Sequence, residues 1–268
     1  MRRTINGYLT ALSKEIVPTK GEKDRVRKSV SYIRRTVASE VRDVEETFVF
    51  GSFDRGTMIR QRFDPKADAD LMIVFDRENK YTPQTYLTRL RKYILNDKFY
   101  KKSLSKQSSP AVVLQLNHIA LELVPAYYNY NTLYIPDPSG SKSFFSSHWQ
   151  RTDPQQAKDV LTDANVRGKS VIKPAIRLMK YWNALNGHVY KSYDLESRIV
   201  NQTYWSAPNL QRVVYGAVRG LRAYDLSQVK ARKVDKLKEI LGIVEDLERR
   251  GLNKEALSIL KTVFPPTK

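Results

Sequence analysis

The sequence contains no cysteine, only three histidines and no long apolar run. The lack of cysteine excludes disulfides, thiolate metal sites and a cysteine nucleophile, and it is compatible with a reducing compartment. His118, His148 and His188 are scattered without the short spacing of a zinc site, so neither zinc nor a histidine-based hydrolase is expected. No stretch reaches the ~18 consecutive apolar residues of a membrane span, and the first residues lack the apolar core of a signal peptide. We therefore expect a cytoplasmic protein with no membrane partner.

Basic residues are in large excess over acidic ones. The chain has 47 Lys and Arg against 28 Asp and Glu, which gives a formal net charge of +19. This excess is more than solubility requires, and it indicates a polyanionic partner such as RNA, DNA, nucleotides or an acidic membrane surface. Charge runs are commonly just solvated faces, so RNA binding stays one of two interpretations. The two basic groups are Lys20, Lys23, Arg25, Arg27, Lys28, Arg34 and Arg35, and Arg89, Arg91, Lys92, Lys98, Lys101, Lys102 and Lys106.

The hydrophobic pattern predicts an α+β fold in two lobes. Apolar residues at helical spacing predict helices over residues 4–16 and 22–41, and β-rich runs then alternate with one further helix. A loop-like stretch at 128–153, most pronounced at 136–143, marks the boundary. We expect a mixed-sheet lobe with amino-terminal helices over residues 1–150 and a helical lobe over 151–268. The expected strands are 47–50, 70–75, 110–116 and 118–127, and the other helices are 83–95, 153–163, 172–185, 193–201, 209–223, 234–249 and 254–264.

Three acids stand in or beside apolar strands. Asp68 and Asp70 are two residues apart at the head of a strand, so alternation directs both carboxylates to one face. Two carboxylates forced together repel, and the arrangement is tolerable when divalent cations lie between them. Glu122 is an acid in another apolar run, IALELVPAY, and a third metal ligand is one explanation for it; an edge-strand acid facing water is the other.

Gly51 and Ser52 form a candidate phosphate-binding turn after the run TFVF. Glycine permits close backbone approach, and the residues that follow look like a short helix whose first N–H groups would face a phosphate. The hydroxyl of Ser52 adds a further donor. Together with the acids, this turn predicts a magnesium and triphosphate site, in which metal bridges the acids to phosphate.

The ordered set of a Gly-Ser turn, an Asp-x-Asp pair and a later strand acid resembles the DNA polymerase beta-like nucleotidyltransferase superfamily. That superfamily includes poly(A) polymerases, CCA-adding enzymes, oligoadenylate synthases and cyclic GMP-AMP synthase. PAIRLMKYWNAL at 174–185 and KSYDLE at 191–196 are similar to segments of the oligoadenylate synthase branch and of bacterial cyclic-oligonucleotide synthases. The resemblance covers residues 48–196 and implies a nucleotidyltransferase palm lobe packed on a helical lobe.

The resemblance also implies a reaction and roles for particular residues. A ribose hydroxyl would attack the α-phosphate of a nucleoside triphosphate; Asp68 and Asp70 would hold two Mg²⁺ ions, or Mn²⁺, and Glu122 would ligate one of them. Glutamate at the third position departs from the commoner aspartate. In the helical lobe, the resemblance gives Lys180 and Ser192 contacts with the donor triphosphate and gives Tyr193 a stacking role on its base. From the residues alone, Lys180 could instead be a lysine that reaches out to solvent, Ser192 a helix N-cap and Tyr193 a packing residue.

Three functions remain open on the sequence. The leading one is synthesis of a cyclic or short linear oligonucleotide second messenger for antiviral or anti-phage signalling, with RNA on the basic face as a possible activator. The second is addition of nucleotides to RNA or tRNA ends. The third is a catalytically silent module that binds nucleotide or RNA, although the intact set of three acids argues against it. Oligomeric state is not predicted.

Overall fold

The computed structural model describes residues 4–76, 81–108, 110–137, 149–204 and 209–267. The chain divides into two compact units. The sheet unit consists of Thr19–Gln61 and Lys66–Ala157, and the helical unit of Met1–Pro18, Arg62–Pro65 and Lys158–Lys268. Most of the predicted loop at 136–143 lies outside the described residues.

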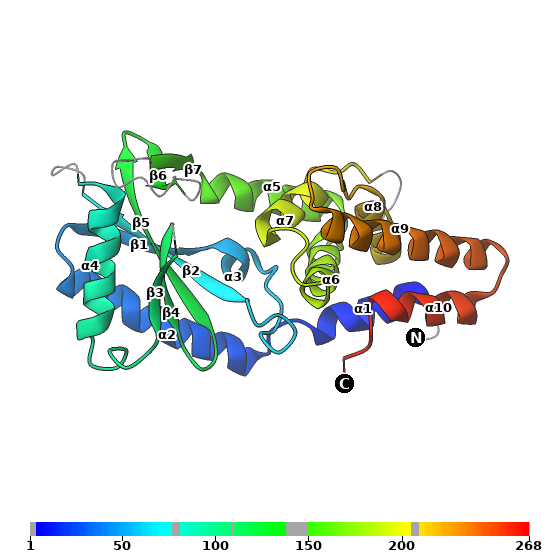
Figure 1. Ribbon diagram of the computed structural model, residues 1–268, viewed down its shortest axis with the longest axis horizontal. Coiled ribbons are helices and arrows are strands. Elements are labelled where there is room, and N and C mark those ends of the chain that lie inside the picture. The colour runs from blue at the N-terminus through cyan, green and yellow to red at the C-terminus, as the bar shows by residue number, and fades with distance from the viewer. Residues whose placement is uncertain (1–3, 77–80, 109, 138–148, 205–208, 268) are drawn as a thin grey trace. The chain divides into compact units, whose positions relative to one another are not determined.

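The sheet unit is built on one mixed sheet (Figure 1). Its described strands run in the order β1-β2-β5-β4-β3, and β6 and β7 continue from the far end of β5. β2 and β5 are parallel, whereas the other neighbours are antiparallel. The strands are β1 Val44–Phe50, β2 Asp68–Phe75, β3 Ser105–Ser108, β4 Ala111–Gln115, β5 Ala120–Asn129, β6 Thr132–Pro136 and β7 Trp149–Thr152.

Alternation along the strands separates two faces of the sheet. On one face, the odd-numbered residues of β2 and β5, such as Leu71 and Leu123, pack with the apolar faces of α2 (Lys20–Glu40) and α4 (Pro83–Asn96). On the other face, Met72 and Val124 belong to a smaller apolar cluster with residues of β1, β4 and β6. Since Asp68, Asp70 and Glu122 share the even parity, they lie on this second face.

The long helix α2 begins and packs as its sequence predicts. Thr19 is the N-cap: its side chain accepts from the backbone N–H of Glu22, and the Glu22 carboxylate accepts in return from the backbone N–H of Thr19. This capping box satisfies two backbone donors at the helix start. Val26, Val30 and Ile33, spaced by three or four residues, are buried against the sheet.

The helical unit combines the first and the last helices of the chain. Figure 1 shows the blue α1 (Ile5–Glu15) beside the red α10 (Asn253–Val263), and α1 also contacts α6 and α8. The hydroxyl of Tyr8 donates to the carbonyl of Phe264 at 2.6 Å. The remaining helices are α5 Pro154–Arg167, α6 Ile172–Leu185, α7 Ser192–Val200, α8 Leu210–Arg219 and α9 Gln228–Arg249.

The α+β prediction is confirmed, and α6 spans the predicted residues 172–185. Three short strands, β3, β6 and β7, were not predicted because their sequences are polar or lie in the stretch that reads as a loop. The predicted division at residue 150 differs from the compact units in that Met1–Pro18 groups with the helical unit. The apolar face of α1 is buried against later helices, which a pattern within α1 cannot reveal. None of the helices in the described ranges combines the length and apolar character needed to cross a bilayer.

Candidate active site

Three carboxylates converge where β1 ends and β2 begins, on the sheet face that α2 and α4 leave uncovered. Parallel pairing of β2 with β5 places Asp70 directly beside Glu122, and Asp68 two residues earlier on the same face. One carboxylate oxygen from each of Asp68, Asp70 and Glu122 lies within 4.8 Å of the other two. The structure therefore brings the three predicted acids into one cluster.

The carboxyl of Glu122 has a raised pKa. Burial and, to a lesser extent, the neighbouring Asp68 carboxylate raise its pKa to about 7, although the Lys106 ammonium acts in the opposite direction. Lys106 lies on β3, a strand that the sequence pattern missed. A cation that enters the cluster would favour the ionised form of this carboxyl. Hard oxygen ligands of this kind suit Mg²⁺ or Mn²⁺, so the residues present fit the predicted metal.

Gly51 is required by both its conformation and its neighbour. Its φ of +72° lies in the left-handed region that side chains disfavour. A Cβ built on Gly51 would lie 1.7 Å from Oδ2 and 2.6 Å from Cγ of Asp70. The antiparallel register explains this closeness, because Phe50, the preceding residue, pairs with Asp70. The missing side chain thus leaves the space that a predicted metal ligand occupies.

The turn after Gly51 is fixed by backbone hydrogen bonds. α3 (Gly51–Arg55) is a single short helix that ends at Gly56, whose φ of 71° is left-handed. The carbonyl of Ser52 accepts from the N–H groups of Thr57 and Met58 at 3.0 and 3.1 Å. Ser52 itself is half-buried at the start of this helix. Gly51 therefore lies against Asp70 and Ser52 follows it in a hydrogen-bonded bend; the contact of this turn with a phosphate stays a prediction.

The other three predicted site residues lie in the helical unit. Lys180 on α6 is 5% exposed, and its Nζ donates to Oε2 of Glu196 on α7 at 2.8 Å. Burial rules out the alternative of a lysine that reaches into solvent. Ser192 is the first residue of α7 and Lys191 is the N-cap, so the N-cap alternative for Ser192 is also wrong. Tyr193 is 57% exposed, which leaves its ring accessible. The roles of these three residues with a triphosphate stay predictions.

Sequence reasoning did not find Glu196. It is 3% exposed, and it supplies the negative charge that makes a buried Lys180 tolerable. The segment KSYDLE contains it, but the pattern marks only its apolar neighbour Leu195 as facing the core. The sequence did contain a signal for this pair: a glutamate on the buried side of one predicted helix and a lysine on the preceding helix. Together they indicate a buried ion pair.

The fold is shared with solved bacterial proteins. CdnC of Escherichia coli MS115-1, solved as a CdnC:HORMA-deltaN complex, superposes with a TM-score of 0.70 over 98% of both chains at 14% identity. DncV of Vibrio cholerae, in its apo form, gives 0.69 over 98% of this chain and 95% of that one at 14% identity. CdnG of Bradyrhizobium diazoefficiens, in complex with GTP, gives 0.67 over 94% and 96% at 13% identity. At these identities the likeness defines a fold class, that of the bacterial nucleotidyltransferases predicted by resemblance.

The sequence itself identifies the family. Residues 3–165, more than half of the chain, match the family described as the Second Messenger Oligonucleotide or Dinucleotide Synthetase (SMODS) domain, and the chain belongs to that family. A probable cyclic nucleotide synthase of Bacillus cereus (strain VD146) is 28% identical over 203 residues, which cover 60% of this chain and 58% of the relative. The predicted resemblance to cyclic-oligonucleotide synthases is confirmed. The matched region contains the Gly-Ser turn and the three acids, but not Lys180, Ser192 or Tyr193.

Proposed function

We propose that this protein is a metal-dependent nucleotidyltransferase that joins nucleoside triphosphates into a cyclic or short linear oligonucleotide messenger. The observation that carries the proposal is the cluster of Asp68, Asp70 and Glu122 next to a glycine whose missing side chain makes room for Asp70. Family membership supports the kind of product, because the family description is that of a second-messenger synthetase.

The three acids would hold one or two divalent cations. When bound, such a cation would neutralise charge on phosphate oxygens and favour ionisation of the attacking hydroxyl. The chain's own contribution is orientation: β2 and β5 hold the carboxylates on one rigid face, and the bend at Gly51 and Ser52 presents its backbone next to them. In the reaction, the ribose oxygen forms a bond to the α-phosphorus, the bond from that phosphorus to the bridging oxygen breaks, and pyrophosphate leaves.

In the helical unit, Lys180 and Ser192 would contact the donor triphosphate and Tyr193 would stack on its base. The exposure of Ser192 and Tyr193 at the start of α7 is compatible with these roles. Lys180 is held by Glu196, so a triphosphate would have to share or displace that partner.

RNA is proposed as an activator that binds the basic face of α2. Arg27, Lys28 and Arg35 line a shallow hollow of about 500 Å³ on this helix, together with Asp24, Ser31 and Tyr32. Arg27 pairs with Asp24 at 3.0 Å, which leaves the hollow with a net positive charge. The family description, that of a second-messenger synthetase, supports a signalling role; that this role acts against phage is proposed from the sequence resemblance alone.

One assay separates the functions. Purified protein is incubated with Mg²⁺ and labelled nucleoside triphosphates, with and without RNA, and the products are treated with phosphatase. Small phosphatase-resistant products that disappear in Asp70→Asn support the proposal. Label that stays on RNA would support addition to RNA ends, which the comparisons do not favour. No product with any metal or RNA would leave a silent binding module.

The signalling role has its own test. Bacteria that express the wild-type protein or Asp70→Asn are challenged with phage, and plaques are counted. We expect fewer plaques only with the wild type; equal plaque numbers over a panel of phages would contradict a role in defence.

A further inference from the structure

A hollow also lies in the helical unit, apart from the one on α2, at the ends of three helices. A cavity of about 800 Å³ is bounded by the second half of α7, the chain that follows α8, and α9. This volume falls in the range of about 300–1,000 Å³ that is usual for small-molecule sites. The described lining includes no carboxylate and four cations: Arg198, Arg219, Arg222 and Lys238.

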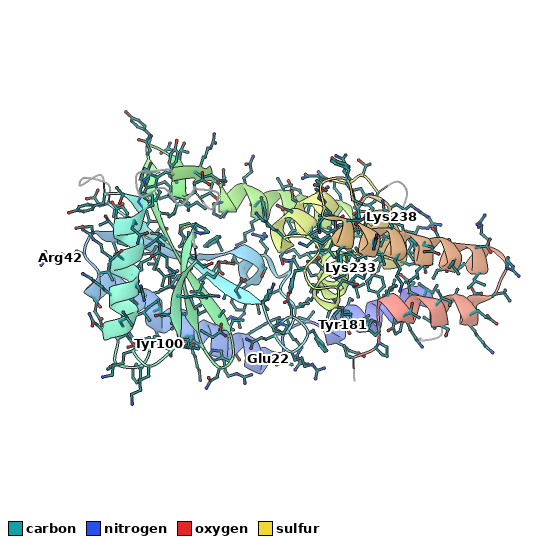
Figure 2. The ribbon with its side chains drawn as sticks, in the orientation of Figure 1. Glu22, Arg42, Tyr100, Tyr181, Lys233 and Lys238 are labelled. Atoms are coloured by element: carbon teal, nitrogen blue, oxygen red, sulfur yellow. The ribbon has the colours of Figure 1, made fainter. Side chains whose placement is uncertain are left out.

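Two of these cations have an acidic partner outside the lining. Arg198 pairs with Asp225 at 2.8 Å, and Arg219 pairs with Glu245. Arg222 and Lys238 have no acidic partner within the described ranges; Figure 2 labels Lys238 on α9. Like charges that line one hollow repel each other, and an anion in the hollow would relieve that repulsion. The electrostatics therefore favour an anionic ligand.

The same lining offers a planar ring and amide groups. The Tyr224 side chain is 79% exposed, and its hydroxyl accepts from Nη1 of Arg222 at 3.2 Å. Gln202 lies against the end of α8, where its Nε2 donates to the carbonyl of Gly216 at 2.8 Å. A Cβ on Gly220 would lie 2.8 Å from the Gln202 amide. Because Gly220 has no side chain, the Gln202 amide can occupy this position in the lining of the hollow. An aromatic face stacks on nucleobases, and cations beside it suit phosphate.

We propose that this hollow, the α7–α9 pocket, binds a phosphate-bearing nucleotide at a site of its own. Arg222 and Lys238 contact the phosphate, and the ring of Tyr224 stacks on the base. The pocket begins at Ser197, whereas the predicted donor-site residues Ser192 and Tyr193 stand at the other end of α7. The inference goes beyond the proposed function, because it needs neither the acid cluster nor a metal.

Binding without metal tests the proposal directly. A non-hydrolysable ATP analogue is titrated into the full chain by calorimetry in EDTA, where the metal-dependent donor site is silent. We expect one bound nucleotide per chain in the wild type and in Asp70→Asn. The double variant Arg222→Ala with Lys238→Ala should bind about 10-fold more weakly or worse, since it removes two cationic donors to a phosphate.

Matched variants control for charge and folding. Lys236→Ala removes a lysine from the same helix, outside the pocket, and should leave the affinity unchanged. Arg222→Lys with Lys238→Arg keeps both charges and should retain most of the binding. The thermal unfolding midpoints of all variants are measured alongside, so that a fall in affinity in a folded protein is attributable to the pocket.

Competitors identify the ligand class. If a linear or cyclic dinucleotide displaces the analogue more strongly than ATP does, the ligand of the pocket is the reaction product. If ATP displaces it more strongly, the ligand is the substrate. Both outcomes support the proposal. No binding in EDTA, equal affinity in the alanine double variant, or equal competition by pyrophosphate would overturn it. A single-stranded RNA that binds far more tightly than any nucleotide through these residues would overturn it as well. If the wild-type protein binds the analogue in EDTA but forms no product with Mg²⁺ and nucleoside triphosphates, the result would contradict the proposed function and not the pocket.

Discussion

Substitution of Gly51 by alanine isolates the contact between the turn and Asp70. Alanine at a left-handed φ costs about 1–2 kcal/mol of the free energy of unfolding. The added Cβ would lie 1.7 Å from Oδ2 of Asp70, whereas ordinary contacts are 3.4–4 Å, so this carboxylate must shift by at least 3.4 − 1.7 = 1.7 Å. A misplacement of about 1 Å near the reacting atoms can cost about 100-fold in rate. We therefore expect Gly51→Ala to lower product formation about 100-fold or more.

Gly56 provides the matched control for this prediction. Its φ of +71° is nearly that of Gly51, but no atom lies within 4 Å of a Cβ built there. Gly56→Ala should therefore also cost about 1–2 kcal/mol and leave most of the activity. Urea unfolding gives the free energies, and product formation at saturating Mg²⁺ and triphosphate gives the rates. Equal activities for the two variants would refute the reasoning that the glycine makes room for the carboxylate.

Three further predictions concern charge. Because the pKa of Glu122 is raised to about 7, the proton competes with metal below that pH: the Mg²⁺ concentration for half-saturation should rise about 10-fold per pH unit from 7 to 5 and stay flat above 8. Calorimetric metal titrations over this pH range check the prediction. Glu122→Gln should bind Mg²⁺ more weakly and without this pH dependence. A wild-type Mg²⁺ affinity that does not change with pH would contradict the coupling between proton and metal binding at Glu122. Lys180→Met removes the cation that pairs with the buried Glu196 and should cost about 3–5 kcal/mol in urea unfolding. Adding Glu196→Met should restore much of the stability but not the triphosphate affinity. A double variant no more stable than the single one would show that the pair is not the cause. Arg27→Glu with Arg35→Glu should weaken RNA binding and lower the slope of log affinity against log salt by about 2, one for each phosphate that is no longer neutralised; an unchanged slope would place RNA elsewhere.

Much of the site could be predicted because its signals are local. Alternation in DLMIVF predicted the shared face of Asp68 and Asp70, and the glycine before Ser52 indicated a bend. The residues alone left Glu122 either as a third metal ligand or as an edge-strand acid. The resemblance was needed to choose, since nothing in IALELVPAY states which strand pairs with β2. The register that pairs Asp70 with Glu122 is a long-range property of the sheet.

The parts that the sequence did not reveal depend on distant partners. β3 reads SKQS, which has no apolar residue to indicate a strand, and it forms because β4 offers an edge. Glu196 is buried because Lys180 stands on the neighbouring helix, and neither residue alone predicts a buried charge. α1 was predicted as a helix, but its membership of the helical unit follows from contacts with helices more than 150 residues later.

That membership has a consequence for biosynthesis. α1 is synthesised well before the helices that contact it, because α6, α8 and α10 are made only after residue 171; the buried residues of α1 include Leu9 and Leu12. At about 5–20 residues per second, this apolar stripe waits roughly 10–30 seconds for α6 and roughly 10–50 seconds for α10. The sheet unit can fold its own core during that interval. The nascent chain therefore contains a folded sheet unit and a helix α1 whose apolar face is still exposed to solvent. A chaperone that shields short amphipathic segments should bind there while translation continues.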